Sequence, residues 1–164
     1  MNKNEIIKYL YNNVDILIYD TLKSSNITAK ELAENGCNEY TTVIAKSQTN
    51  GKGRLGRSFI SNSENGLYMS IVLKPTISPD QCTSITTMAA AAVLEAIKET
   101  SNTAPTIKWI NDVYINDKKV CGILTEASFD NHRLNYVIVG IGINITPGCG
   151  EKENHGQNNG AKHQ

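Results

Sequence analysis

A glycine-rich basic loop is the first segment of this 164-residue chain whose residue types can do chemistry. It reads Gln48-Thr49-Asn50-Gly51-Lys52-Gly53-Arg54-Leu55-Gly56-Arg57, and from Lys46 to Arg57 the chain carries four positive charges and no acid. Glycines let a backbone close on a ligand, and Lys and Arg bind phosphate or carboxylate. The loop therefore predicts a clamp for an anionic ligand, with a solvated basic loop as the alternative.

The glycines of this loop also match the spacing G-x-G-x-x-G, but their context excludes a dinucleotide-binding fingerprint. That motif must open a helix, so that the pyrophosphate meets the helix N-terminus. Here the loop leads through the polar stretch 61–66 into an expected strand, and no Gly-Lys-Ser/Thr follows at the spacing of a phosphate loop. A nucleic-acid patch is disfavoured as well, because no aromatic residues alternate with the basic ones.

A second segment, Lys108-Trp109-Ile110-Asn111-Asp112, precedes Lys118-Lys119-Val120-Cys121-Gly122 and holds the chain's single Trp. Asn and Asp oxygens in this segment could bind Mg²⁺ or ribose, and an ordinary strand end with a turn is the alternative. The third segment is Gly140-Ile141-Gly142-Ile143-Asn144. Glycines inside a strand predict close approach of a ligand or another backbone, or a tight sheet crossing, and Asn144 could offer its amide to such a ligand.

Cysteine and histidine spacing argues against other kinds of site. The cysteines form no C-x-x-C pair, so a metal site built on them is disfavoured. Free thiols are expected rather than disulfides, because no secretory signal is visible. His132 is the only His before residue 146 and lies in a polar turn, which argues against a Ser–His–Asp site. The four cysteines are Cys37, Cys82, Cys121 and Cys149.

The elements that must position these segments follow from hydrophobic periodicity and turn residues. A short amphipathic helix is expected around Ile6, Ile7 and Leu10. Further helices are expected over 27–35 and from the capping segment Ser78-Pro79-Asp80-Gln81 through Ile97. Strands are expected over 14–19, 41–46, 67–73, 106–109, 113–115, 119–127 and 134–145. Serial strands joined by short turns favour antiparallel pairing, so the class is α+β.

Local signals refine this picture. The run Ser24-Ser25-Asn26 offers N-cap side chains to the second helix, and Gly36 suits its C′ position. The strand 67–73 alternates in a way that predicts one buried face, and Asn116-Asp117 predicts a hairpin turn. An apolar stripe on the long helix is expected to face the core. The stripe comprises Ile85, Met88, Ala89, Ala92, Val93, Ala96 and Ile97.

Composition narrows the class of protein. Sixteen basic and sixteen acidic residues give a formal net charge of zero, which argues against electrostatic binding to nucleic acid or a membrane surface. No apolar run approaches the ~20 residues that span a bilayer. With the polar N-terminus, this predicts a cytoplasmic protein. Residues 1–145 are expected to form one domain, and 146–164, rich in Gly, Asn and His, a disordered polar tail.

In this order, the segments resemble the biotin–protein ligase family, also called biotin–[acetyl-CoA-carboxylase] ligases. The family's hallmarks are Ser-Thr-Asn before a helix, a Gly-Arg-Gly-Arg-Arg-Gly-Arg loop, Lys-Trp-Pro-Asn-Asp, a Lys…Gly-Ile-Leu strand and a Gly-Ile-Gly-Ile-Asn strand. The matching segments here are 24–26, 51–57, 108–112, 119–124 and 140–144, so the resemblance covers roughly residues 14–145. Any one motif is weak, but five in sequence are specific.

The resemblance implies a fold, a reaction and a partner. The fold is a catalytic domain of the class II aminoacyl-tRNA synthetase and biotin ligase type, with a mixed, largely antiparallel sheet and helices packed on it. The reaction joins biotin and ATP into biotinyl-5′-AMP, with Mg²⁺ as the metal, and then transfers biotin to a lysine of a biotin carboxyl carrier domain. Relatives can form homodimers through sheet edges, so a homodimer is a further expectation.

The resemblance also implies roles for individual residues. The catalytic residues would be Arg54, Lys108 and Lys119, and Mg²⁺ would bind Asn111 and Asp112. Biotin would contact Ser24, Ser25, Asn26, Gln48, Lys52, Gly53, Arg54, Lys119 and Gly122. ATP would contact Lys52, Arg54, Arg57, Phe59, Trp109, Asn111, Asp112 and Asn144.

The sequence departs from the family in several places. Ser25 replaces Thr, Lys52 replaces Arg and loses its bidentate geometry, Ile110 replaces Pro, and Phe59 stands where a Trp is frequent. No DNA-binding winged helix precedes the match, and neither the family's further helices nor its C-terminal β-barrel follows it, so a C-terminally truncated ligase is expected. A non-catalytic biotin-binding remnant or pseudogene product, and a lipoate–protein ligase-like enzyme, remain the alternatives.

Overall fold

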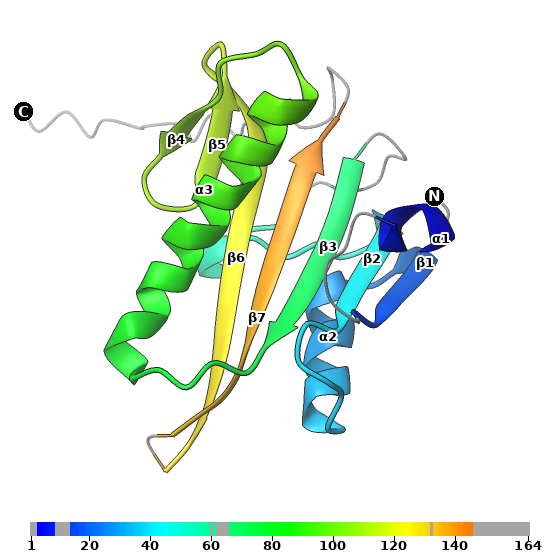
Figure 1. The fold of residues 1–164 in the computed structure, drawn as a ribbon, viewed down its shortest axis with the longest axis vertical. Helices are drawn as coiled ribbons and strands as arrows, with labels where there is room; N and C mark the ends of the chain where they lie inside the picture. The colour runs from blue at the N-terminus through cyan, green and yellow to red at the C-terminus, as the bar shows by residue number, and fades with distance from the viewer. Residues whose placement is uncertain (1–2, 9–13, 60, 62–65, 132, 146–164) are drawn as a thin grey trace, which may run out of the picture.

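A seven-stranded sheet dominates the structure, a computed structural model that describes residues 3–8, 14–59, 61, 66–131 and 133–145. Three helices accompany it: α1 (Lys3–Ile7), α2 (Ser25–Glu34) and α3 (Cys82–Thr100) (Figure 1). The strands are β1 (Ile16–Leu22), β2 (Thr42–Gln48), β3 (Gly66–Leu73), β4 (Thr106–Lys108), β5 (Asp112–Ile115), β6 (Lys118–Asp130) and β7 (Arg133–Asn144). All the expected elements in the described residues are present, with ends displaced by a few residues.

The strand order is β1-β2-β3-β7-β6-β5-β4. Only β1 and β2 run parallel, because α2 provides the crossover that parallel neighbours require. Every other neighbouring pair is antiparallel. This confirms the expected α+β class and the mixed, largely antiparallel sheet.

Helices cover both faces of the central strands. On one face, α3 packs against a core that includes Val137, Val139 and Ile141 of β7. On the other face, α2 packs against Val43, Val72 and Ile138. Strand 67–73 alternates as expected, with one fully buried face: Tyr68, Ser70 and Val72 are buried on the α2 side, while Met69, Ile71 and Leu73 are half-buried under α3.

The buried line of α3 differs from the expected apolar stripe. It runs through Thr86, Ala90 and Val93, and Thr86 is buried because its hydroxyl bonds that of Thr125 on β6 at 2.9 Å. Met88, by contrast, is 69% exposed. Ala92 and Ala96 are exposed as well, whereas Ile85, Ala89 and Ile97 pack on the core as expected. Because apolar residues lie on both sides of this helix, the sequence pattern did not determine which side faces the core.

Three turns have the conformation that the sequence predicts. The short 3₁₀ turn Pro79–Gln81 precedes α3, and the Gln81 side chain accepts a hydrogen bond from the Ser78 N–H at 3.1 Å. Asn116 and Asp117 both have positive φ, 48° and 60°, as a two-residue hairpin turn of type I′ needs. Gly36 has φ +80° directly after α2, as a C′ glycine does.

Several expectations concern residues outside the described ones, namely Leu10, His132, Cys149 and the stretch 146–164. The thiols of Cys37, Cys82 and Cys121 are free, as expected. Within the described part of the chain, no helix is long and apolar enough to cross a membrane.

Candidate functional site

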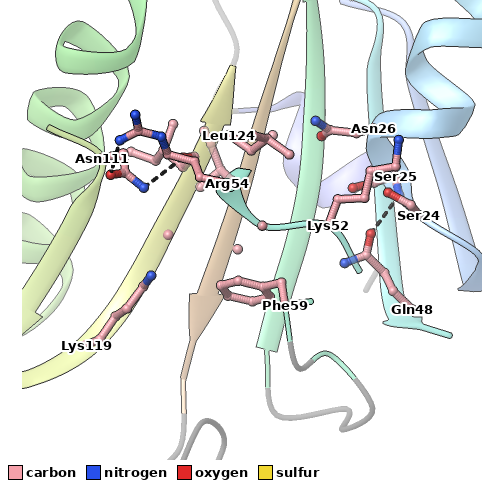
Figure 2. Close-up of a pocket in the computed structure, with 16 residues that line it drawn as sticks. Ser24, Ser25, Asn26, Gln48, Lys52, Arg54, Phe59, Asn111, Lys119 and Leu124 are labelled. Carbon is pink, nitrogen blue, oxygen red and sulfur yellow. Dashed lines mark hydrogen bonds between the residues drawn. The ribbon is translucent and has the colours of Figure 1, made fainter. Parts of the chain in front are cut away.

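A pocket opens on the α2 face of the sheet, and the strand register explains its floor. Two rows of paired residues cross the sheet there. One row runs from Tyr68 through Gly142 and Gly122 to Asp112, and the other from Ser70 through Gly140 to Leu124. Glycines in both rows leave the floor low, so side chains from α2 and from the loop after β2 can lie on the sheet (Figure 2).

The first wall of the pocket is the N-terminus of α2, where Ser24, Ser25 and Asn26 are buried. Ser24 occupies the N-cap position, but its side chain makes no capping hydrogen bond, so the expected side-chain cap is wrong. Gln48, at the end of β2, takes that place: its Oε1 accepts a hydrogen bond from the Ser25 N–H at 2.7 Å. The amide nitrogen of Gln48 is left for other partners.

The second wall is the basic loop, which folds back on itself. Gly53 N–H donates to the Arg57 carbonyl at 2.8 Å, and Phe59 N–H donates to the Gly51 carbonyl at 2.8 Å. A Cβ on Gly51 would lie 2.5 Å from the Phe59 carbonyl oxygen, so this turn requires glycine. At its tip Leu55 has φ 55° and is 91% exposed.

Three cationic side chains from two distant segments meet at the pocket (Figure 2). Lys52 Nζ lies 3.9 Å from Glu126 Oε1, and Arg54 donates to Asn111 Oδ1 at 2.9 Å. Lys119 Nζ lies 2.9 Å from Asp112 Oδ1. Three cations against two carboxylates leave an excess of positive charge, which favours an anionic ligand.

The strand glycines make room for side chains of the protein itself. A Cβ on Gly142 would lie 2.6 Å from Phe59 Cε1, and one on Gly122 would lie 3.0 Å from Phe59 Cε2. A Cβ on Gly140 would collide with Asn26 Oδ1. The close approach at these strand glycines is made by the Asn26 and Phe59 side chains, and the three glycines also line the pocket.

Most of the predicted site residues line this one pocket. They are Ser24, Ser25, Asn26, Gln48, Lys52, Gly53, Arg54, Phe59, Asn111, Lys119 and Gly122. Their convergence could not follow from spacing, because α2, the loop and β6 are brought together only by the sheet.

Five predicted residues do not line the pocket. Asp112 contacts two residues that do line the pocket, Lys119 and Asn111. Lys108 instead places its Nζ 5.2 Å from the ring centre of Tyr114, and Trp109 is 77% exposed. Arg57 is exposed on the loop, and Asn144 lies beyond the glycine rows with its Oδ1 buried and without a hydrogen-bond partner. Lys46, counted with the basic loop, pairs with Asp20 at 2.6 Å on the outer strands instead.

Sequence reasoning missed Ser70 and Glu126, which bond the pocket residue Asn26. A signal was available for Glu126: it follows Gly122 and Leu124 at a spacing of two along β6, which puts it on the same face. Ser70 carried no comparable signal, because a Ser inside an apolar strand is unremarkable in composition.

Asn111 and Asp112 do not fit Mg²⁺ as they are arranged here. Asn111 Oδ1 accepts from Arg54 and Asp112 Oδ1 faces Lys119, so these oxygens already bind cationic nitrogens. The Asn111 amide nitrogen also donates to Asp112 Oδ1 at 2.8 Å. In the described part of the chain, His, Cys, Asp and Glu form no group of three that could hold a metal ion.

Comparison with known sequences places this geometry in context. The profile of the Biotin/lipoate A/B protein ligase family matches residues 18–144. The bifunctional ligase/repressor BirA of Bacillus subtilis is 43% identical over 130 residues, which are 79% of this chain and 40% of that protein. The biotin–[acetyl-CoA-carboxylase] ligase of Paracoccus denitrificans is 35% identical over 124 residues, 74% of this chain and 51% of that protein.

Solved structures share the fold. Biotin protein ligase from Aquifex aeolicus, in complex with biotin and ATP, superimposes with a TM-score of 0.61 at 32% identity, over 79% of this chain and 51% of that one. The biotin acetyl coenzyme A carboxylase synthetase of Helicobacter pylori, at 22% identity, matches in fold with a TM-score of 0.62, over 80% of this chain and 61% of that one. The chain thus spans about half the length of the relatives it matches.

Proposed function

Since this chain belongs to the biotin/lipoate A/B protein ligase family, we propose that it activates biotin with ATP and transfers it to a lysine of a biotin carboxyl carrier domain. The observation that carries this proposal is the meeting of Lys52, Arg54 and Lys119 at one pocket, beside the buried N-terminus of α2. The pocket therefore combines the polar side chains at the α2 N-terminus with three cationic side chains, which suits a ligand with a neutral polar ring and a carboxylate.

The ring system of biotin lies against the N-terminus of α2 in this proposal. Ser24, Ser25 and Asn26 are buried there, and Gln48 has its amide nitrogen available, because its oxygen is engaged by the Ser25 N–H. These groups match a cyclic urea, which carries both N–H donors and a carbonyl acceptor. Buried polar groups that need partners give such a site its selectivity.

The carboxylate and the α-phosphate meet between the three cationic side chains. A carboxylate oxygen of biotin attacks the α-phosphorus of ATP, the bond to the β-phosphate oxygen breaks, and pyrophosphate leaves. Lys52, Arg54 and Lys119 oppose the negative charge that builds on the phosphate oxygens, which lowers the barrier of such a step. For this, Arg54 and Lys119 must exchange Asn111 and Asp112 for the ligand, and both side chains are accessible enough to do so.

The second step is acyl transfer to the carrier domain. The neutral lysine nitrogen attacks the biotinyl carbonyl carbon, the bond to the phosphate oxygen breaks, AMP leaves, and the nitrogen releases a proton. The loop from Gly51 to Arg57 lies where it could shield the mixed anhydride from water before transfer. Mg²⁺ is supplied with ATP in the experiments below, and no step here depends on a metal site of the chain.

Two linked measurements test this proposal. Calorimetric titration with biotin and with lipoate should show saturable binding of biotin, and Mg-ATP should then give biotin-dependent release of pyrophosphate. Lys119→Ala should lower that release by about 10²-fold or more, whereas Lys98→Ala, a lysine paired with Glu95 on the surface of α3, should leave it unchanged.

The other outcomes separate the alternatives. Biotin binding without pyrophosphate release would identify a non-catalytic biotin-binding protein. Preference for lipoate would identify a lipoate–protein ligase-like enzyme. A folded protein that binds neither compound would overturn the proposal.

A further inference from the structure

A chain of four polar side chains runs under the pocket, and two of its members lie outside every motif that the sequence offers. Ser25 Oγ and Ser70 Oγ are 2.8 Å apart, and Ser70 Oγ lies 2.6 Å from Asn26 Oδ1. Asn26 Nδ2 in turn donates to Glu126 Oε2 at 2.7 Å. Ser25, Asn26 and Ser70 are buried, so the two bonds of Ser70 are made away from bulk water, whereas the bond from Asn26 to the partly exposed Glu126 is half-buried.

The sheet register brings the chain together. Ser70 on β3, Gly140 on β7 and Leu124 on β6 form one row, and Glu126 lies two residues beyond Leu124 on the same face. Asn26 reaches down from α2 onto Gly140, where a Cβ would collide with its side-chain oxygen. The glycine therefore lets Asn26 lie between Ser70 and Glu126 and bond both.

The Glu126 carboxylate fixes the orientation of the Asn26 amide. An ionised carboxylate only accepts, so Asn26 must turn its NH₂ group toward Glu126 and its oxygen toward Ser70. The Ser70 hydroxyl is placed to donate to Asn26 Oδ1 and also to Ser25 Oγ. Ser70 therefore supports both side chains from the strand below them.

We propose that Ser70 and Glu126 are positioning residues that together hold the Asn26 and Ser25 side chains in the orientation they present to the pocket. Gln48, whose oxygen is held by the Ser25 N–H, presents its NH₂ group as a donor beside them. These groups offer polar partners to the N–H and C=O of a urea or amide edge. This inference rests on the proposed function in assigning that edge to the ring of biotin.

A double-mutant cycle on the full chain tests the connection. Ser70→Ala and Glu126→Gln should each weaken biotin binding about tenfold, the effect of one unmade buried hydrogen bond. The neutral amide of Glu126→Gln can donate as well as accept, so Asn26 is free to flip and the orientation of its amide is lost. Because both variants break the same chain, the double variant should also lose about tenfold, rather than the ~100-fold of independent sites.

Two controls make the measurement specific. Titration with biotin amide, which keeps the urea ring but lacks the carboxylate, removes the direct effect of the Glu126 charge on the ligand through Lys52, which lies 3.9 Å from the Glu126 carboxylate. Glu95→Gln, on the exposed face of α3, should leave both affinities unchanged. Additive losses in the cycle, or unchanged affinity for biotin amide in both single variants, would overturn the inference.

A second measurement needs no ligand, so failure of the inference can be told from failure of the proposed function. The side-chain NH₂ signals of Asn26, identified by their loss in Asn26→Ala, should show one downfield proton protected from solvent exchange. That protection should disappear in Glu126→Gln. If the wild type binds no biotin but shows the protected proton, the proposed function fails and the positioning chain stands. An unprotected, freely exchanging Asn26 amide in the wild type would refute the chain itself.

Discussion

Gln48 accepts a hydrogen bond from the backbone N–H of Ser25 through its side-chain oxygen at 2.7 Å, so a residue at the end of β2 caps the first turn of α2. The two residues are 23 positions apart in sequence and lie side by side at the pocket. One amide group thus has two separable tasks: its oxygen stabilises the helix end, and its nitrogen is available to a ligand.

Gln48→Glu should separate these tasks. The carboxylate keeps an acceptor for the Ser25 N–H and suits the positive end of the helix dipole, so the free energy of unfolding should stay within about 0.5 kcal/mol of wild type. The lost NH₂ donor should raise the Kd for biotin at least about tenfold. Gln48→Ala should instead cost about 1 kcal/mol of stability, as a lost helix cap does.

Gln81→Glu is the matched control for Gln48→Glu, because Gln81 also accepts from a backbone N–H near a helix start, that of Ser78, but lies away from the pocket. It should leave biotin affinity unchanged. Urea unfolding measures the free energy of unfolding, and calorimetric titration measures the affinity for biotin. Equal affinity in Gln48→Glu and wild type would show that the Gln48 amide nitrogen does not bind biotin.

Arg54→Ala should slow biotin-dependent pyrophosphate release by about 10²–10³-fold, the usual effect of removing a charge that stabilises a transition state. Stability should change by less than ~1 kcal/mol, because the Arg54–Asn111 bond is exposed. Arg133→Ala, an exposed arginine at the start of β7, serves as the control and should behave as wild type. Equal rates of pyrophosphate release in both variants would show that Arg54 does not act in the catalytic step.

The sequence was sufficient to predict the elements and most of the residues that meet at the pocket. Apolar runs and turn residues indicated the strands, with clear alternation in strand 67–73. The ordered motifs carried the family resemblance, which the family match over residues 18–144 then confirmed. These signals are local, or depend on motif order, and neither requires knowledge of which strands are neighbours.

What remained hidden depends on contacts between distant segments. Local pattern put an N-cap side chain at Ser24, but the cap comes from Gln48 across the β1–β2 crossover. Glycines in β7 indicated a close approach, but only the fold shows that the Asn26 and Phe59 side chains lie against them. Lys108 shared a motif with Asn111, yet its side chain lies over Tyr114, a contact that depends on the pairing of β4 with β5 and that the motif does not contain.

Gly142→Ala tests the packing of Phe59 on the sheet. The added Cβ would lie 2.6 Å and 2.7 Å from two carbons of the Phe59 ring, which is itself held edge-on against Tyr68. Such overpacking should lower the free energy of unfolding by about 1–3 kcal/mol. Phe59→Ala should be destabilising alone, but in the Gly142→Ala background it should restore part of the loss, since it removes the clash. Strictly additive losses in urea unfolding would show that the two positions do not meet.

The Cys121 thiol should make stability depend on pH above the range where most of the chain's carboxylates titrate. Burial raises its pKa from an ordinary 9.0 to about 12, with Lys119 opposing and Asp112 adding to the shift. Below about pH 9 the thiol is protonated in both the folded and the unfolded protein, so its contribution is constant. Between pH 9 and about 12 only the unfolded chain ionises, so stability falls as the pH rises, by about 1.4 kcal/mol at pH 10. Cys121→Ala lacks this thiol but keeps every other titratable group of the chain, so the difference between the two proteins isolates Cys121. Urea unfolding at pH 8 and pH 10 should show a larger loss for wild type than for Cys121→Ala, and parallel pH curves would mean that the thiolate forms equally well in the folded core.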